Sequence, residues 1–152
     1  MIGLHGSFVE VFGMGLFIKG KSGIGKTTLL LKLINRGHFF VSDDLVIFKK
    51  DNFSRVIAFN NGKFIAYLRN FGFIDIIKIY GIKSVKDSSV LNLIIELRQD
   101  EFLFEEEEIL NVKFKKIILS PNVDIENLEN YIEILKAEIY DRIYWAYCGY
   151  WY

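Results

Sequence analysis

Residues 20–27, with the sequence Gly-Lys-Ser-Gly-Ile-Gly-Lys-Thr, have the types and spacing that bind a polyphosphate. Gly20, four further residues and then Gly25-Lys26-Thr27 match the phosphate-loop pattern in full. The glycines let backbone N–H groups turn toward phosphate oxygens, and the N-terminus of the following helix adds partial positive charge. Lys26 would neutralise the β- and γ-phosphates, and the Thr27 hydroxyl would hold Mg²⁺. The stretch predicts binding of ATP or GTP. The expected nucleotide-binding residues are Gly20, Lys21, Ser22, Gly23, Ile24, Gly25, Lys26, Thr27 and Thr28.

Asp43 and Asp44 are the expected source of the carboxylates that phosphoryl transfer needs for metal placement and for an oriented nucleophile. Neighbouring side chains of an extended strand point to opposite faces, so a pair serving one site should stand where the strand ends and the chain turns. One carboxylate would take the proton of the nucleophile, and the other would serve the metal or orientation. The alternative is a solvated acidic turn, because aspartate is common in turns for conformational reasons alone.

The histidines and the cysteine give weaker signals. His5 precedes the first expected strand and would reach the phosphate loop if the two N-terminal strands form a hairpin; a packed or turn histidine is the alternative. His38 follows Gly37 at a helix end, where it would interact favourably with the helix dipole. Neither histidine has metal-ligand spacing with the other or with Cys148. A single cysteine cannot form an internal disulfide bond, which fits a reducing compartment.

The N-terminal elements are those that would position the loop and the aspartates. Two short strands are expected at residues 7–12 and 16–20, with a glycine-rich turn at residues 13–15. A helix is expected over residues 26–36, followed by a strand over 38–42 that delivers the aspartate pair. The inner face of the helix would carry Leu29, Leu30, Leu33 and Ile34.

The middle of the chain favours further strands. Asn60-Asn61-Gly62 separates apolar runs at residues 55–59 and 63–68, a pattern that predicts a two-stranded hairpin. A short buried helix is expected from Phe73.

Two strands, at residues 90–98 and 112–119, and a helix from Asp124 to about Arg142 are expected toward the C-terminus. The acidic run Glu105–Glu108 between the strands predicts a solvated loop. The helix would have Ile125, Leu128, Ile132 and Leu135 as its inner stripe. The aromatic tail at residues 144–152 would pack on the core of the chain or form a subunit contact.

Composition restricts the class of protein. The chain has 152 residues, of which 51% are hydrophobic, so one domain with a real core is the expectation. Lys plus Arg and Asp plus Glu both number 19, so no global field favours nucleic acid or an anionic membrane. No run of about 18 apolar residues occurs, and we expect a cytoplasmic protein. The sequence contains no Asn-Lys-x-Asp motif, which argues against a GTPase. The expected antiparallel strands argue against a large motor ATPase.

The order of these motifs resembles that of the catalytic domain of bacterial HPr kinase/phosphorylase. In that family a His-Gly pair, a short hairpin, a phosphate loop, a helix ending in Arg-Gly-His and a segment ending in Asp-Asp follow one another, as they do in residues 4–44. A second, less similar stretch covers residues 67–97, so that the resemblance spans about two-thirds of the chain. It implies an α/β P-loop kinase of the HPr kinase/PEP carboxykinase type, with mixed, largely antiparallel sheets packed with helices.

The resemblance also implies the activity and the roles of residues. Members use ATP and Mg²⁺ to phosphorylate a serine of HPr, the phosphocarrier of the sugar phosphotransferase system, and reverse the step by phosphorolysis. The catalytic aspartate of the family corresponds to Asp43, and the histidine of the His-Gly pair corresponds to His5. The neighbouring aspartate corresponds to Asp44, which would share the metal with Thr27. A homo-oligomer is expected because members are typically hexameric, with the Arg69 region as a possible interface. Residues 1–152 would form the catalytic domain alone, without the N-terminal domain of many members.

Three departures distinguish this chain from the family. Tyr67 replaces the glutamate thought to assist the metal site, and Asn70 replaces the following glycine. Residues 120–123, Ser-Pro-Asn-Val, correspond best to a basic loop implicated in phosphorolysis, and contain no arginine. Losing that charge should weaken binding of free phosphate more than binding of ATP, which predicts a kinase-biased or weakened enzyme.

Three hypotheses follow. The first is phosphoryl transfer from ATP to HPr or another small protein. The second is a non-catalytic nucleotide-binding module, and the third is a kinase of the same fold with a different substrate.

Overall fold

The computed structural model of the chain describes residues 1–99 and 103–147, with side chains as far as residue 139. The chain forms two compact units, Met1–Asn122 and Val123–Tyr152.

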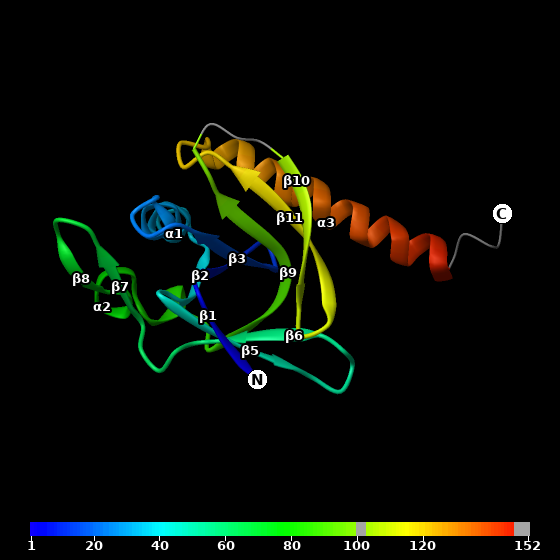
Figure 1. Cartoon of the computed structure of the whole chain (residues 1–152), viewed down its shortest axis with the longest axis horizontal. Coiled ribbons are helices and arrows are strands. Elements are labelled where there is room, and N and C mark those ends of the chain that lie inside the picture. Colours follow the sequence, from blue (N-terminus) through cyan, green and yellow to red (C-terminus); the bar gives the residue numbers. More distant parts are fainter. Residues whose placement is uncertain (100–102, 148–152) are drawn as a thin grey trace. The chain divides into compact units, whose positions relative to one another are not determined.

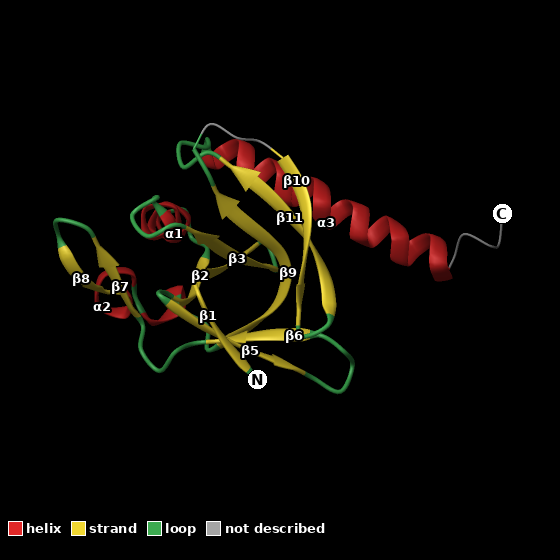
Figure 2. Cartoon of the chain, viewed as in Figure 1, coloured by secondary structure: helices red, strands yellow, loops and turns green. Residues whose placement is uncertain are grey.

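The first unit is built around one large sheet (Figures 1 and 2). Its strands follow the order β1-β5-β6-β9-β3-β2-β4. Off this path, β11 also pairs with β9, and β10 pairs with β11. Both β3 and β11 run parallel to β9, whereas the other described pairs are antiparallel. This confirms the expected mixed, largely antiparallel α/β fold. The strands of this sheet are β1 (Ile2–His5), β2 (Ser7–Val11), β3 (Met14–Gly20), β4 (Phe39–Ser42), β5 (Leu45–Lys50), β6 (Val56–Phe59), β9 (Ser88–Leu97), β10 (Leu103–Ile109) and β11 (Val112–Leu119).

The smaller elements of this unit contact helix α1 (Lys26–Asn35) through strand β7. A separate two-stranded sheet consists of β7 (Ile65–Leu68) and β8 (Gly72–Asp75), and is followed by α2 (Ile76–Tyr80) and a 3₁₀ turn at Ile82–Ser84. These elements are grouped on the left of Figure 1.

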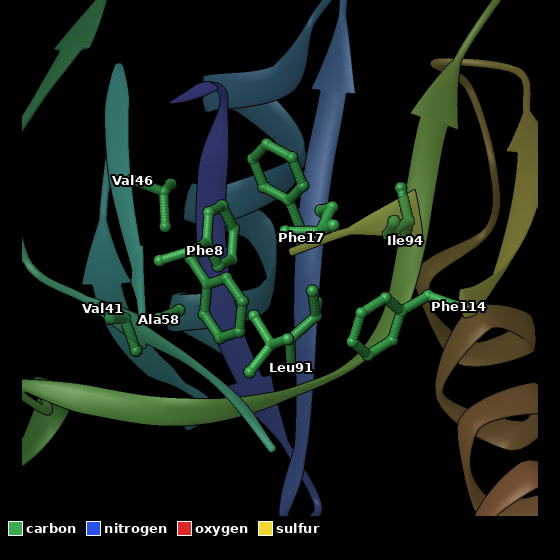
Figure 3. Close-up of a cluster of buried hydrophobic side chains, with 11 residues drawn as sticks. Phe8, Phe17, Val41, Val46, Ala58, Leu91, Ile94 and Phe114 are labelled. Carbon is green, nitrogen blue, oxygen red and sulfur yellow. The ribbon is translucent and has the colours of Figure 1, made fainter. Parts of the chain in front are cut away.

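An aromatic and aliphatic core holds the large sheet together (Figure 3). The rings of Phe17 on β3 and Phe48 on β5 meet edge to face at 5.0 Å, and Phe8 on β2 meets Phe48 in the same way at 6.2 Å. Each fully buried phenylalanine contributes about 2 kcal/mol of hydrophobic stabilisation or more. The packing joins strands that are distant in sequence, among them β2, β3 and β4. The cluster comprises Phe8, Phe17, Val41, Val46, Phe48, Val56, Ala58, Leu91, Ile94, Ile109 and Phe114.

The N-terminal elements agree closely with expectation. The β2–β3 turn lies at Phe12-Gly13, with φ of 52° and 80°, one residue earlier than the glycine-rich stretch indicated. Positive φ at both centres matches the right-handed twist of the strands. The structure adds β1, which pairs antiparallel with β5, so that His5 ends a strand instead of preceding the first. His38 is buried after α1, with its ring edge against Phe12 at 5.0 Å.

The expected hairpin around Asn60-Asn61-Gly62 is wrong. β6 pairs with β5 and β9, and β7 pairs with β8 instead. The reason is that the asparagine side chains bind other backbone groups: Asn60 Nδ2 donates to Val41 O at 2.6 Å and to Lys63 O at 2.8 Å. Asparagine can satisfy backbone groups in a loop as well as in a tight turn. The segment therefore connects two sheets.

The acidic run Glu105–Glu108 is likewise part of a strand, β10, and not a solvated loop. It lies opposite the basic residues of β11, with Glu105 facing Lys116, Glu106 facing Lys115 and Glu108 facing Lys113. Opposite charges directly across an antiparallel pair stabilise it, and the partner strand that supplies them lies outside the acidic run itself.

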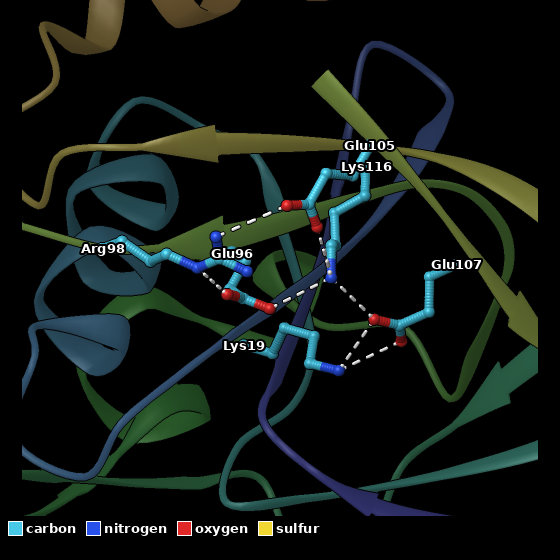
Figure 4. Close-up of polar contacts among 6 residues, drawn as sticks. All are labelled: Lys19, Glu96, Arg98, Glu105, Glu107 and Lys116. Atoms are coloured by element: carbon cyan, nitrogen blue, oxygen red, sulfur yellow. Dashed lines mark hydrogen bonds and ion pairs between the residues drawn. The ribbon is translucent and has the colours of Figure 1, made fainter. Parts of the chain in front are cut away.

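The charge cluster on this part of the sheet consists of Lys19, Glu96, Arg98, Glu105, Glu107 and Lys116 (Figure 4). Lys116 Nζ lies 3.1–3.3 Å from the carboxylates of Glu96, Glu105 and Glu107. Burial alone would lower the pKa of Lys116, but hydrogen bonds to Glu107, then Glu96 and Glu105, raise it. The Glu107 carboxylate also binds Lys19 Nζ at 2.9 Å, and Lys19 immediately precedes Gly20. The cluster therefore fixes the strand end from which residues 20–27 begin.

The segment from Phe73 is only partly helical. Phe73 belongs to β8 and is exposed, and α2 begins at Ile76, the only buried residue of that helix. Asp75 interrupts the expected helix because its side chain accepts a hydrogen bond from the Lys78 N–H at 3.1 Å and so caps a new start.

The second unit contains α3 (Ile125–Tyr147), which is longer than expected. Asp124 Oδ1 accepts from the Glu126 N–H at 2.9 Å, as its position before the helix indicated. Of the expected stripe, Leu128, Ile132 and Leu135 are buried and Ile125 is partly buried. The expectations for Cys148 and for the packing of the aromatic tail at residues 144–152 lie outside the described side chains. Among the described helices, none is both long and apolar enough to cross a membrane.

Candidate functional site

An open cleft of about 1150 Å³ is lined by the segments that were predicted from the sequence to form the site. Its walls come from the end of β1, the loop before α1, the turn between β4 and β5, and the β7–β8 hairpin. These segments extend from His5 to Phe73 in the sequence, so the fold and not local sequence assembles the cleft. The residues that line it are His5, Gly6, Gly20, Ser22, Gly23, Gly25, Lys26, Thr27, Thr28, Asp43, Asp44, Lys63, Ile65, Tyr67, Leu68, Arg69 and Phe73.

The loop from Gly20 to Thr27 connects β3 to α1 as a phosphate loop does. Gly23 and Gly25 have φ of 81° and 120°, a region that side chains with a Cβ rarely adopt. Helix α1 has no side-chain cap at its N-terminus. Its first N–H groups therefore remain available to an anion, which the helix dipole also favours.

The Lys26 side chain is hydrogen-bonded to the loop that precedes it. Its ammonium donates to Gly20 O at 2.8 Å and to Lys21 O at 3.0 Å. An ammonium has three donors, so one remains for a phosphate oxygen.

Asp43 is the most constrained carboxylate of the cleft and is 5% exposed. Its Oδ1 accepts a 2.6 Å hydrogen bond from the Ser7 hydroxyl, and its Oδ2 accepts one from Thr27 Oγ1 at 3.2 Å. The carboxylate thus contacts the threonine expected to hold the metal. Sequence reasoning brought Asp43 and Thr27 to one site, but it missed Ser7, because a lone serine at a strand start carries no distinguishing signal.

Asp44 shares the cleft because the backbone reverses there. Its φ is 70°, and the Leu45 N–H donates to Asp43 O at 2.8 Å, which closes a three-residue turn. Such turns are rare and strained, and strain of this kind concentrates at functional sites. The turn lets adjacent side chains reach one cleft, as the position after a strand end indicated.

Gly6 ties the His5 segment to this turn. Its N–H donates to Asp44 O at 3.1 Å, and a Cβ at this position would lie 2.5 Å from Phe17 Cε1. Glycine is therefore required for the close approach. His5 itself is exposed and lines the cleft.

Asn61 is a further residue that sequence reasoning assigned to a different role. Its side-chain amide donates to Asp43 O at 2.9 Å, and its backbone N–H donates to Ser42 Oγ at 3.2 Å. The asparagine-rich segment therefore supports the aspartate turn. Asparagine residues that do not form a hairpin turn can therefore indicate a loop that supports a neighbouring segment.

The β7–β8 hairpin forms the wall that faces residues 20–27. Tyr67 is 55% exposed and contacts Phe73 edge to face, with ring centroids 5.3 Å apart. Tyr67 stands where the resemblance implied a metal-site glutamate, so the wall offers an aromatic ring at that position. Pro121, in the turn after β11, borders the phosphate loop: a Cβ at Gly25 would lie 3.6 Å from Pro121 Cβ.

The donor set fits a magnesium ion. Thr27, Asp43 and Asp44 supply hydroxyl and carboxylate oxygens, which Mg²⁺ prefers, and this ion normally binds through one or two carboxylates plus phosphates and waters. Within the described residues no three His, Cys, Asp or Glu side chains gather as a metal site, so a denser all-protein cage is not available there.

Comparison with known proteins identifies relatives of this chain. The family model described as the HPr Serine kinase C-terminal domain matches residues 1–140. The HPr kinase/phosphorylase of Malacoplasma penetrans is 32% identical over 148 residues, which cover 90% of this chain and 48% of that protein. The enzyme of the same name from Lachnoclostridium phytofermentans is 41% identical over 100 residues, covering 64% of this chain and 32% of that protein. The chain therefore spans at most about half the length of these relatives.

A solved structure, that of the HPr(Ser) kinase/phosphatase from Coxiella burnetii, has the same fold. It superimposes with a TM-score of 0.85 at 27% identity, covering 97% of this chain and 99% of that one.

Proposed function

Because this chain belongs to the HPr kinase family, to which its match with the C-terminal domain assigns it, we propose that it transfers the γ-phosphoryl group of ATP to a serine hydroxyl of HPr. The single observation that carries the proposal is the contact between Thr27 Oγ1 and Asp43 Oδ2 at 3.2 Å. It joins the phosphate-binding loop to a carboxylate in one cleft, and both are parts that phosphoryl transfer needs.

Each cleft segment has a proposed role. The backbone N–H groups of residues 20–27 and the Lys26 ammonium bind the phosphates of ATP. Asp43 accepts the proton of the attacking serine hydroxyl, and Ser7 and Asn61 orient this aspartate. His5, which lines the cleft, would act as a further catalytic group on the phosphate side. Thr27 and Asp44 would hold Mg²⁺, which when bound neutralises charge on the transferred phosphoryl group.

The proposed enzyme favours phosphorylation over phosphorolysis. Pro121 borders the phosphate loop, yet Ser120, Pro121 and Asn122 carry no positive charge. Binding of free phosphate depends on such a charge more than binding of ATP does, because ATP is also held by Lys26 and the loop amides.

A specific observation favours a second candidate, a nucleotide-binding module without catalysis. Tyr67 presents its ring to the cleft where family resemblance implies a metal-assisting glutamate, and Asn70 replaces the glycine that follows. Loss of one oxygen ligand weakens the hold on Mg²⁺ and so the transfer step. A kinase of the same fold acting on another hydroxyl compound is the third candidate.

One experiment separates these candidates. The protein is incubated with Mg²⁺ and ATP labelled in the γ-phosphate, together with HPr or a panel of small hydroxylated metabolites. Label on HPr that disappears in Asp43→Asn supports the proposal. Label on a metabolite supports the third candidate. ATP binding that Lys26→Ala abolishes, without transfer to any acceptor, supports the second.

We further propose that residues 1–152 act as one catalytic domain in the cytoplasm and assemble as a homo-oligomer. Support for assembly comes from exposed apolar side chains of the first unit, since such patches mark interfaces. Light scattering of the purified protein across concentrations tests it, and a constant monomer mass contradicts it. These exposed side chains include Phe71, Phe73, Ile79 and Ile82, which are close in sequence.

A further inference from the structure

We propose that Arg69 is a second phosphate-binding cation of the cleft, acting from the β7–β8 hairpin. This inference rests on the proposed function in one respect: it requires that the cleft bind a polyphosphate. Arg69 follows β7, in the turn that leads to β8.

The position of the Arg69 guanidinium is the first observation. A Cβ on Gly23 would lie 3.5 Å from Arg69 Nη1, so the guanidinium stands directly over the phosphate loop. Both residues line the same cleft. Since residues 20–27 direct backbone N–H groups toward an anion, a group this close to Gly23 is within reach of the same anion.

The turn that carries Arg69 is well defined. The Phe71 N–H donates to Leu68 O at 3.0 Å, and Asn70 has a φ of 72°. The strands on either side are in register, with Leu68 opposite Gly72. A short ordered hairpin fixes the backbone from which the guanidinium extends, so less conformational freedom is lost when a ligand binds.

The absence of a partner is the second observation. Among the described residues, Arg69 makes no hydrogen bond or ion pair, whereas Arg36, Arg55 and Arg98 each have a partner there. Arg69 and Lys26, two groups of like charge, line the same cleft. Two cations directed into one cleft repel each other unless an anion lies between them.

The chemistry of the two cations is complementary. Lys26 already donates two of its hydrogen bonds to Gly20 O and Lys21 O. A guanidinium is a planar fork that binds two phosphate oxygens at once, which an ammonium does not. The ligand class that suits both groups is a di- or triphosphate, and Arg69 would contact a phosphate facing the β7–β8 wall.

Calorimetric binding of ATP and of inorganic tripolyphosphate to the whole chain, at 0.15 M salt, tests the assignment. Tripolyphosphate lacks the nucleoside and so reports the phosphate contacts alone. The variants are Arg69→Gln, Arg69→Lys and Lys26→Ala. Lys32→Gln is the matched control because it also removes one positive charge, from an exposed position of α1 that does not line the cleft.

The proposal predicts that Arg69→Gln weakens binding of both ligands by about 10-fold or more, as loss of a charged hydrogen bond does. Arg69→Lys should lie between Arg69→Gln and the natural protein, and Lys32→Gln should stay within about twofold of the natural protein. Thermal unfolding of Arg69→Gln should match that of the natural protein, since Arg69 is exposed and makes no hydrogen bond or ion pair among the described residues.

Three results overturn the assignment. If Lys26→Ala loses binding but Arg69→Gln does not, Arg69 is not a phosphate ligand and the proposed function stands. If Lys32→Gln weakens binding as much as Arg69→Gln, the effect is a distant field and not a contact. If the natural protein binds neither ligand, this assignment and the proposed function both fail.

Discussion

The Ser7 hydroxyl and the Asp43 carboxylate are joined by a 2.6 Å hydrogen bond across 36 residues of sequence. Both residues are buried, with 0% and 5% of their surface exposed. The bond fixes Oδ1 of the aspartate, while Oδ2 lies 3.2 Å from Thr27 Oγ1. The start of β2 therefore orients a carboxylate at the end of β4 toward the phosphate loop.

Ser7→Ala is expected to lower kcat about fivefold, because one hydrogen bond of about 1 kcal/mol no longer orients Asp43, and to leave the KM for ATP unchanged. Ser89→Ala is the matched control, since Ser89 is also buried and donates to a carboxylate, that of Glu10, away from the cleft. Steady-state kinetics of the two variants checks this. An equal fall of kcat in both would reduce Ser7 to a general packing residue.

Asp43 and Asp44 should respond differently to substitution by asparagine. Asp43→Asn removes the proposed base and should lower kcat by about 100-fold or more at saturating Mg²⁺. Asparagine also tolerates positive φ, so Asp44→Asn should keep the turn. Loss of the carboxylate should raise the Mg²⁺ concentration that activity requires, and added metal should partly restore the rate. Magnesium titrations of initial rate distinguish the two. Rescue of Asp43→Asn by added metal, with none for Asp44→Asn, would reverse the two roles.

Lys116→Gln should lower the free energy of unfolding by about 2 kcal/mol, because it leaves the carboxylates of Glu96, Glu105 and Glu107 facing one another without their shared cation. Lys113→Gln, at an exposed position of the same strand, should change it by less than about 0.5 kcal/mol. Urea unfolding at pH 7 measures both. Equal effects would mean that the charge cluster adds nothing beyond ordinary surface pairing.

The charge cluster also predicts acid sensitivity. Burial alone would raise the pKa of Glu96, but hydrogen bonds from Arg98 and Lys116 lower it below its ordinary value. The stabilisation is therefore present above the ordinary pKa of Glu96 and is lost as pH falls through its lower folded pKa. Urea unfolding from pH 7 to pH 3 should show a smaller fall of stability in Glu96→Gln than in the natural protein. Parallel pH profiles would remove Glu96 from the acid response.

The phosphate loop and the aspartate pair could be predicted from sequence because their signals are local. Residues 20–27 carry a pattern that one loop geometry requires, and Asp43-Asp44 follow a short apolar strand. The β2–β3 hairpin and α1 were predicted for the same reason: turn glycines and helical spacing lie within a few residues of each other.

What the sequence did not predict depends on contacts between distant segments. Asn61 was assigned to a hairpin turn, but its amide supports Asp43, 18 residues earlier. The run Glu105–Glu108 has the composition of a loop and forms a strand only because β11 presents lysines opposite it. The roles proposed for Ser7 and Arg69 depend on their positions relative to Asp43 and Gly23, which lie far from them in sequence, and neither residue type predicts such a role by itself.

The most direct test of the central claim is intact-mass spectrometry of HPr after incubation with this protein, ATP and Mg²⁺. We predict one added phosphoryl group, located on a serine by peptide sequencing, and its absence when Asp43→Asn replaces the natural protein. Unmodified HPr under conditions in which the natural protein binds ATP would contradict the claim.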